Sequence, residues 1–388
     1  MTFQYSHCIQ RLIFVGVMLL MLGCSAKDNS EPPAELVDFE ATINVEKVWS
    51  QDSGKGSGKL ALKLEPYIEQ DRLYVVDNEG KLSAFEKESG TPVWQTKTKV
   101  KASAGLGGGW GLLVFGSSAG DVVAFSQKTG EELWRTTVTS EVLAPPVVAS
   151  DVVLVRALDG RLFALDAVDG SQLWVVARSV PSLSLRGYSS PVVTSGVVLA
   201  GFDNGKISAV SLRAGRTAWE TGIAFPRGRT ELERMVDLDG KPVVVGNVIY
   251  SASFQGKLAA LNLANGEVIW SRKLSSFRDL FVDGDQLFAT DADGFVWSFD
   301  RSTGAALWRQ DKLKARKVTS PTVTGDYVVV ADYAGYVHWL SRFDGRFVSR
   351  SKVDGSGISA APQTHQDAVY VLSQSGQITV LKVVADNS

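Results

Sequence analysis

Residues 146–176 read PVVASDVVLVRALDGRLFALDAVDGSQLWVV. The stretch contains four short runs of β-branched and aromatic residues, and aspartate and glycine separate them. PVV opens the first run, DVVLVR the second, GRLFALD the third and SQLWVV the fourth. Such runs, bounded by residues that form tight turns, are typical of β-strands joined by hairpins. The stretch therefore predicts one four-stranded unit.

The same unit recurs along the chain. A glycine equivalent to Gly160 opens each third run, at Gly80, Gly120, Gly160, Gly205, Gly256, Gly294, Gly335 and Gly376. A second glycine follows ten residues after each of the first seven, and six of these units carry a tryptophan four residues later, at Trp94, Trp134, Trp174, Trp219, Trp270 and Trp308. Four-stranded units of about 40 residues indicate a β-propeller.

The chain ends predict how the ring closes. The eighth unit lacks its fourth run, because its tryptophan position would fall at 390, after the last residue. The run VEKVW, residues 45–49, supplies a matching strand near the N-terminus. We therefore expect residues 41–388 to form an all-β, eight-bladed β-propeller whose N-terminal strand completes the last blade. The repeated tryptophans are predicted to pack between neighbouring blades.

The first forty residues have a different composition. Arg11 precedes the apolar run LIFVGVMLLML, residues 12–22, which is too short for a bilayer core that needs about 20 residues. This pattern predicts a signal peptide at 1–23. The sequence before Cys24 resembles the lipobox of bacterial lipoproteins, although Met21 replaces the usual leucine. The resemblance implies lipidation at Cys24, a flexible lipidated tether at 24–40 and, from Ser25, sorting to the outer membrane. An ordinary signal peptide with an incidental cysteine is the alternative.

Several function classes lack their sequence signals. A net charge of −2 without a basic region argues against nucleic-acid binding. Cys8 and Cys24 are the only cysteines, so the folded body has no disulfide or thiol nucleophile. His338 and His365 lack metal-ligand spacing, and GLGGGWG, residues 105–111, lacks the spacing of a dinucleotide-binding loop. We therefore predict no catalytic residue, no metal and no cofactor.

The repeat lengthens at two consecutive intervals. The first glycines are 45 residues apart from Gly160 to Gly205 and 51 apart from Gly205 to Gly256, against 38–41 elsewhere. Both insertions follow the tryptophan, in the loop from the outer strand of one blade to the inner strand of the next. Loops of one type share one face of a propeller, and insertions in repeat proteins commonly build the binding face.

The two insertions contain residues that suit a protein contact. The first carries Leu183, Leu185 and Arg186, and an arginine among apolar side chains is typical of an interaction hot spot. The second, RGRTELERMVDLDG, carries mixed charges that suit a polar rim. In the alternative interpretation, both leucines pack beneath the propeller and the charges are simply solvated.

Two family resemblances extend this interpretation. ALDAVDGSQLW, residues 164–174, resembles the tryptophan-docking motif of quinoprotein dehydrogenases, which implies the fold. The mature chain, with SLSLRG at 182–187 and RMVDLD at 234–239, resembles the BamB family of lipoproteins in the outer-membrane β-barrel assembly machinery. That resemblance implies that Leu183, Leu185 and Arg186 contact BamA, and that Asp237 and Asp239 are the acidic positions of a second partner-binding segment.

The BamB resemblance also implies a function. The protein would be a non-enzymatic scaffold, lipid-anchored at the periplasmic face of the outer membrane. Its partners would be the periplasmic domains of BamA, other subunits of the complex and nascent outer-membrane proteins. A periplasmic dehydrogenase that uses pyrroloquinoline quinone on the same fold is the alternative function, although such enzymes need a calcium ion, an acidic base and, in many members, adjacent cysteines.

Overall fold

The computed structural model describes residues 31–58, 60, 62–187 and 189–384. The predicted signal peptide and Cys24 lie outside the described residues. The chain from Ala34 onward forms one compact unit, separate from Met1–Pro33. Its described residues form eight four-stranded sheets, β1 to β32. No helix long and apolar enough to cross a membrane occurs among the described residues.

Each sheet is one blade, and in every blade except the last the four strands follow one another in the chain. Blade 1 contains β2 (Tyr67–Glu69), β3 (Arg72–Val76), β4 (Lys81–Glu86) and β5 (Pro92–Lys97). Blade 2 contains β6 (Gly107–Gly109), β7 (Leu112–Gly116), β8 (Asp121–Ser126) and β9 (Glu132–Thr137). Blade 3 contains β10 (Val147–Ala149), β11 (Val152–Arg156), β12 (Arg161–Asp166) and β13 (Gln172–Ala177). Blade 4 contains β14 (Val192–Thr194), β15 (Val197–Gly201), β16 (Lys206–Ser211) and β17 (Thr217–Gly222).

The second half of the ring repeats this order. Blade 5 contains β18 (Val243–Val245), β19 (Val248–Ala252), β20 (Lys257–Asn262) and β21 (Val268–Lys273). Blade 6 contains β22 (Phe281–Asp283), β23 (Gln286–Thr290), β24 (Val296–Asp300) and β25 (Ala306–Gln310). Blade 7 contains β26 (Thr322–Thr324), β27 (Tyr327–Ala331), β28 (Tyr336–Ser341) and β29 (Phe347–Lys352). Blade 8 contains β30 (Gln363–His365), β31 (Ala368–Leu372), β32 (Gln377–Val384) and β1 (Asn44–Asp52).

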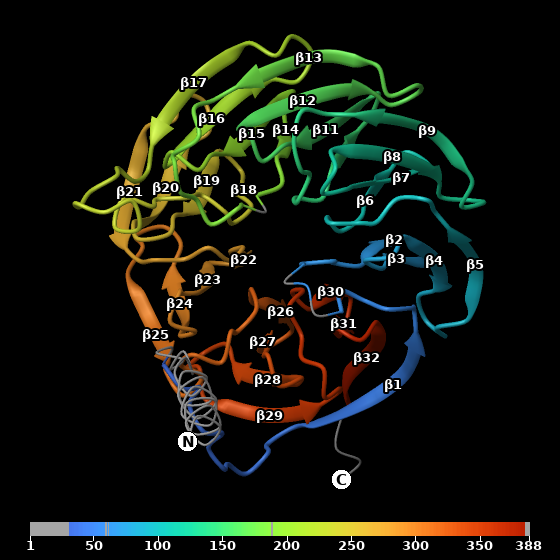
Figure 1. The fold of residues 1–388 in the computed structure, drawn as a ribbon. Coiled ribbons are helices and arrows are strands. Elements are labelled where there is room, and N and C mark those ends of the chain that lie inside the picture. Colours follow the sequence, from blue (N-terminus) through green and yellow to red (C-terminus); the bar gives the residue numbers. More distant parts are fainter. Residues whose placement is uncertain (1–30, 59, 61, 188, 385–388) are drawn as a thin grey trace, which may run out of the picture. The chain divides into compact units, whose positions relative to one another are not determined.

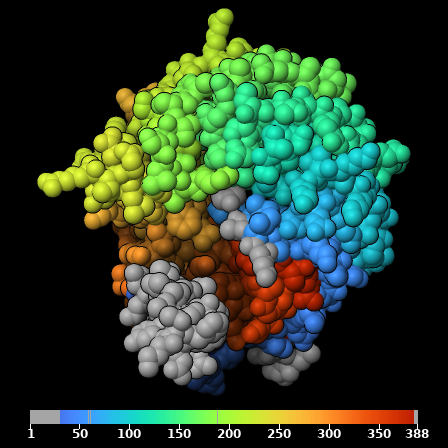
Figure 2. All heavy atoms as spheres, in the orientation of Figure 1, coloured from blue at the N-terminus to red at the C-terminus, as the bar shows by residue number. Residues whose placement is uncertain are grey.

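The blades surround a central axis, with the short first strand of each blade innermost and its fourth strand on the rim (Figure 1). Figure 2 shows the same face with all heavy atoms drawn. The ring closes where β1 pairs antiparallel with β32, from Asn44 opposite Val384 to Asp52 opposite Gln377. The predicted eight-bladed propeller, closed by an N-terminal strand in the last blade, is confirmed.

The repeated tryptophans join each blade to the next. Their indole N–H groups donate to a backbone carbonyl of the following blade: Trp49 to Lys87, Trp94 to Gln127, Trp134 to Ala167, Trp174 to Leu212, Trp219 to Leu263, Trp270 to Arg301 and Trp308 to Arg342. The second glycine of each repeat accommodates the ring. A Cβ added at Gly170 would lie 2.5 Å from Cε3 of Trp134, so no larger residue fits without a shift. The predicted packing between blades is confirmed.

Blade 7 exchanges the two residues of one cross-strand pair. In blade 3, Ala164 on β12 lies opposite Trp174 on β13. In blade 7, the large residue is instead on the third strand, since Trp339 on β28 lies opposite the small Ser349 on β29. Trp339 is fully buried. The exchange keeps one large and one small side chain in the pair, so the missing seventh tryptophan is compensated within the same sheet.

Residues 34–40 depart from the prediction of a flexible tether over 24–40. Ala34 donates its backbone N–H to the carbonyl of Lys314, and Arg350 donates to the carbonyl of Val37. The ring of Phe39 stacks on Phe347 with centroids 5.3 Å apart. These contacts fix the segment on blade 7, because its apolar side chains find partners there. The tether prediction is therefore wrong for residues 34–40.

Candidate functional site

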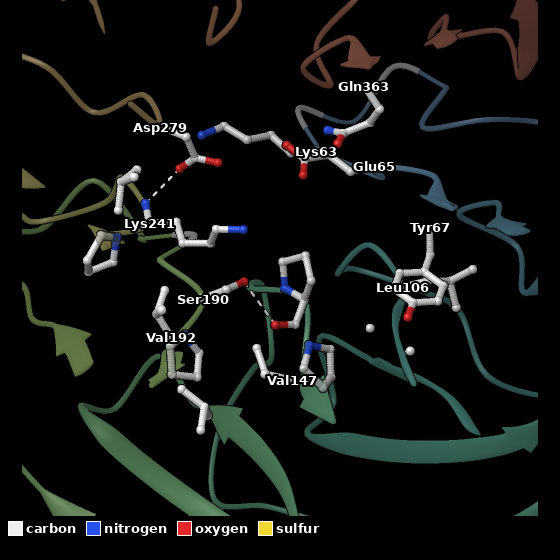
Figure 3. Close-up of a pocket in the computed structure, with 18 of the residues that line it drawn as sticks. Lys63, Glu65, Tyr67, Leu106, Val147, Ser190, Val192, Lys241, Asp279 and Gln363 are labelled. Atoms are coloured by element: carbon white, nitrogen blue, oxygen red, sulfur yellow. Dashed lines mark hydrogen bonds between the residues drawn. The ribbon is translucent and has the colours of Figure 1, made fainter. Parts of the chain in front are cut away.

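A cavity of about 580 Å³ lies at the inner ends of the blades. Its walls are mainly valine, proline and glycine from the innermost strands, together with Lys63, Glu65, Lys241 and Asp279 (Figure 3). Burial, together with the charge of Asp279, raises the pKa of Glu65 to about 7, and Lys241 and Lys63 oppose this shift. The carboxylates of this cavity therefore lie beside lysine ammonium groups. A calcium site of the kind that a quinoprotein enzyme needs would instead have its carboxylates directed at the metal ion.

The two insertions lie between blades 3 and 4 and between blades 4 and 5, and only their last residues, at 190–191 and 241–242, line this cavity. We call residues 178–191 the first insertion and residues 223–242 the second insertion. In the first, Leu183 is 42% exposed, Leu185 is half-buried, and the Arg186 side chain is 60% exposed. The alternative in which both leucines pack beneath the propeller therefore does not describe Leu183.

The second insertion has an exposed part and a buried part. Residues 225–234, which carry most of the charged side chains expected to form a polar rim, are exposed, whereas residues 235–240 are buried. Asp237 has no exposed surface and Asp239 is 3% exposed. Their side chains are thus neither solvated nor accessible to a partner in this conformation, so any part they play in binding is indirect.

The buried part of the second insertion holds the first. The backbone N–H of Leu185 donates to Oδ1 of Asp237 over 3.0 Å, and Ser189 Oγ donates to the carbonyl of Gly240. Gly187 lies so close to Asp239 that an added Cβ would be 2.2 Å from its Oδ1. The insertions, which the sequence shows only to be consecutive, are therefore in contact.

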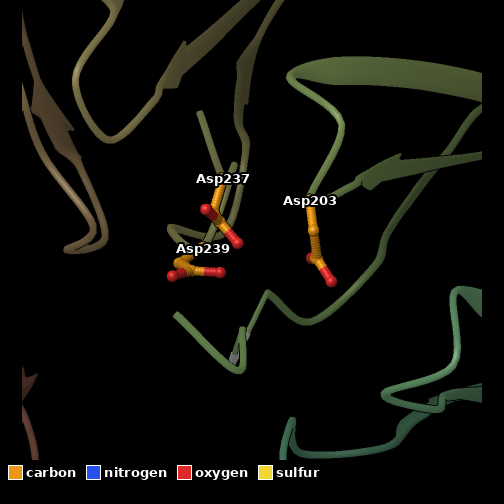
Figure 4. A group of neighbouring side chains, drawn as sticks. All are labelled: Asp203, Asp237 and Asp239. Atoms are coloured by element: carbon orange, nitrogen blue, oxygen red, sulfur yellow. The ribbon is translucent and has the colours of Figure 1, made fainter. Parts of the chain in front are cut away.

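A third aspartate completes a buried acidic cluster of Asp203, Asp237 and Asp239 (Figure 4). Each offers a carboxylate oxygen, and these three oxygens lie within 4.8 Å of one another. Arg156 from blade 3 donates to Asp203 Oδ1 over 2.9 Å and also to the carbonyl of Gly201. Carboxylate oxygens suit hard cations, but here the guanidinium of Arg156 supplies positive charge beside the cluster.

Burial dominates the electrostatics of the cluster. Burial, together with the neighbouring charges of Asp237 and Asp203, raises the pKa of Asp239 to about 8. Burial also raises the pKa of Asp237 to about 6, although the hydrogen bond from Leu185 acts in the opposite direction. Burial lowers the pKa of Lys63, and the nearby Arg278 charge lowers it further. The pKa values of Asp237 and Asp239 therefore both lie well above the ordinary value of an aspartate.

Arg186 connects the first insertion to a further loop. Its guanidinium lies 3.2 Å from Oε1 of Glu141, between blades 2 and 3. The backbone of Arg186 is in the left-handed region, with φ of 63°. An arginine rarely adopts this conformation, so the contacts of the flanking Leu185 and Gly187 hold the turn that presents its side chain.

Sequence reasoning missed Asp203, Arg156 and Glu141. Asp203 resembles the many turn aspartates of the repeat, and Arg156 ends an ordinary blade strand. No spacing rule relates these residues to the insertions, because their proximity depends on the curvature of the ring.

Comparison with known proteins identifies the relatives of this chain. The profile of a family described as outer membrane protein assembly factor BamB matches residues 41–106, 79–310 and 298–386. The BamB of Shewanella oneidensis is 35% identical over 387 residues, covering 96% of this chain and 98% of the relative. The BamB of Xanthomonas campestris pv. campestris is 37% identical over 397 residues, with the same two coverages. The chain belongs to the BamB family.

Solved structures agree with this assignment. BamB from Moraxella catarrhalis superposes with a TM-score of 0.80 at 28% identity, over 87% of this chain and 100% of that protein. A quinohemoprotein alcohol dehydrogenase from Comamonas testosteroni gives a TM-score of 0.70 at 13% identity, over 89% and 77% of the two chains. The second likeness shows the fold alone. The BamB resemblance drawn from the sequence is confirmed.

Proposed function

We propose that this protein is a non-catalytic assembly factor for outer-membrane proteins that binds the periplasmic domains of BamA through its first insertion. Membership of the BamB family supports the assembly role. The lining of the central cavity, where lysines lie among the carboxylates, supports a scaffold in place of a quinone enzyme. Other subunits of the complex and nascent outer-membrane proteins are its further proposed partners.

The hydrogen bond between Leu185 and Asp237 is the observation that carries the proposed contact. It fixes the first insertion so that the exposed Leu183 and Arg186 project from a rigid support. An apolar side chain beside an arginine, both ordered before binding, is the composition of a hot spot and reduces the entropic cost of association. Leu185, half-buried, would be partly covered by the partner.

In our proposal, Asp237 and Asp239 support the partner-binding residues of the first insertion from the interior of the protein. Both are buried, so they position the first insertion and do not touch the partner. Removing either side chain would therefore weaken binding by loosening residues 185–187.

The proposed location is the periplasmic face of the outer membrane, with a lipid at Cys24 as the anchor. Support comes from the lipobox-like sequence before Cys24 and from Ser25 after it. Acyl chains contribute about 0.8 kcal/mol per buried CH₂, and more than one chain is needed for a stable anchor. The tether available to the anchor ends before Ala34, where the chain docks on blade 7.

The test measures binding of purified BamA periplasmic domains to the mature protein and to Leu183→Ala/Arg186→Glu. We expect the variant to lose at least about thirtyfold in affinity, corresponding to about 2 kcal/mol, with an unchanged melting temperature. Titration calorimetry supplies the affinities.

A matched control makes the same two changes on another blade. Leu307→Ala/Arg309→Glu alters a leucine and an arginine of similar exposure in β25, and it should leave the affinity within about twofold of the wild type. Equal affinity of all three proteins would show that the first insertion does not bind BamA, and equal losses would show a non-specific effect of charge.

A further inference from the structure

The rim of the propeller carries a repeated apolar position. The residue before each tryptophan lies in the fourth strand of its blade, and in six blades it is a large aliphatic side chain that is 43–53% exposed: Val48, Val93, Leu133, Leu173, Ile269 and Leu307. Blade 4 has the smaller Ala218 there. Exposed aliphatic side chains on an unpaired outer strand favour association with another strand.

Blade 7 shows what covers this position. Its equivalent residue, Val348, is only 4% exposed. The chain's own N-terminal segment lies against it: Thr42 donates its backbone N–H to the carbonyl of Val348 over 2.9 Å, and Ile43 and Val45 pack in the same apolar cluster. An outer strand of this propeller therefore accepts both a main-chain hydrogen bond and apolar side chains from a neighbouring segment.

Strand β13 is the outer strand least protected against such pairing. Its sequence, QLWVVA, contains no charged residue and no proline. The other outer strands carry at least one charged residue: β1, β5, β9, β17, β21, β25 and β29. Charges and proline on an edge strand are the usual protection against pairing with another chain.

The surroundings of β13 extend its apolar surface. Val168 before the strand is 84% exposed, Leu173 and Val175 within it are 48% and 42% exposed, and Val180 after it is 38% exposed. Among the described residues, the main-chain hydrogen bonds of β13 go only to β12. The side chain of Arg178 also donates to the carbonyl of Ala177 at the end of the strand. Figure 1 shows β13 on the rim of blade 3, where it leads into the first insertion.

We propose that the outer edge of β13 binds an extended segment of unfolded polypeptide by β-augmentation, with apolar residues at alternate positions of that segment on Leu173 and Val175. Main-chain hydrogen bonds supply the affinity in this mode and alternate side chains the selectivity. Unfolded strands of outer-membrane barrels have this alternating pattern. The identity of the segment as such a strand rests on the proposed function, whereas its docking mode rests on the edge itself.

The test uses a fluorescent peptide of alternating valine and threonine with a lysine at each end. Anisotropy titration measures its binding to the mature protein, to Leu173→Lys and to Val175→Lys. We expect each variant to weaken binding by about tenfold, because a lysine on an edge strand opposes pairing. The matched control, Leu307→Lys, changes the same residue type at the same position of β25 with similar exposure and should bind like the wild type.

Two further measurements decide the mode and the independence of the site. A peptide N-methylated at alternate residues cannot donate along one edge, and undiminished binding of that peptide would overturn β-augmentation. Equal weakening by Leu307→Lys, or none by either β13 variant, would overturn the assignment to β13. Binding of BamA periplasmic domains is measured for the same variants: retained BamA binding with lost peptide binding separates this site from the first insertion. Melting temperatures confirm that each variant is folded.

Discussion

At the scale of single residues, the first insertion depends on groups that never reach the surface. Asp237 accepts the Leu185 N–H, Asp239 lies against Gly187, and Arg156 offsets part of the negative charge through Asp203. A buried carboxylate is costly unless it is paired or protonated. The raised pKa of Asp239 therefore connects the support of the loop to pH.

This connection predicts the pH dependence of Asp239→Asn. The folded protein retains the Asp239 proton up to a pKa of about 8, whereas the unfolded chain loses it near the ordinary value of 3.8. The unfolded state thus binds fewer protons between these values, and the free energy of unfolding falls as pH rises from about 4 to 8. Asparagine has no such proton, so between pH 5 and pH 8 the variant should gain about 3–4 kcal/mol in free energy of unfolding relative to the wild type.

Urea denaturation of both proteins at pH 5 and pH 8 measures this difference. Asp237, Asp203, Arg156 and Lys63 surround the same position in both proteins, so the comparison isolates the change made at Asp239. Asp285→Asn, whose side chain is 96% exposed, serves as the control and should follow the wild type. A parallel decline for Asp239→Asn would mean that Asp239 is already charged in the folded protein at pH 5.

At the scale of elements, neighbouring blades are joined by a contact between the tryptophan of one blade and the second glycine of the next. Gly170 has φ of 74° and would place a Cβ 2.5 Å from the Trp134 ring, whereas Gly196 has φ of 75° with nothing within 4 Å of an added Cβ. Both glycines adopt a left-handed conformation that costs alanine about 1 kcal/mol. Only Gly170 adds a steric conflict between blades.

We therefore predict that Gly170→Ala destabilises the propeller by about 1–3 kcal/mol more than Gly196→Ala, because overpacking adds to the same backbone strain. Chemical denaturation of the two variants isolates the steric part of the cost. Equal destabilisation would mean that the Trp134 ring moves aside freely, and that the glycine is required only for its backbone conformation.

The elements were predictable where the sequence repeats. The tryptophan and the glycine represented by Trp174 and Gly170 recur at fixed spacing because every blade packs against an equivalent blade. A repeat in the sequence therefore predicts a repeat in the structure. The insertions have no period. The burial of Asp237 and its contact with Leu185 depend on how two irregular loops meet, which neither composition nor spacing encodes. The docking of residues 34–40 was missed because two prolines and several charges outweighed the apolar signal of Leu36, Val37 and Phe39.

At the scale of the whole molecule, closure of the ring makes the N-terminal strand part of the last blade. β1 pairs along β32, and Trp49 from β1 donates to the carbonyl of Lys87 in blade 1. One strand therefore completes a sheet and joins two blades. Without it, the edge of β32 and the apolar cluster that includes Tyr370 and Val380 would be uncovered, and unpaired strand edges promote association between chains.

A chain that begins at Ser53 should therefore lose far more stability than one that begins at Ala34. Removing β1 deletes the partly buried Trp49 with its apolar contacts and also the pairing along β32. We expect these losses together to cost about 3–5 kcal/mol, as the loss of a large core aromatic does. For a domain of this size, each kcal/mol lowers the melting temperature by about 2 °C or slightly more, so we expect a decrease of about 10 °C together with concentration-dependent association in size-exclusion chromatography. The protein that begins at Ala34 keeps β1 and the docked segment, and it should have the same melting temperature as the mature protein.

Equal melting temperatures for the two truncations would show that seven complete blades and an open eighth blade are already stable. In that case β1 would serve attachment to the anchor more than closure of the ring.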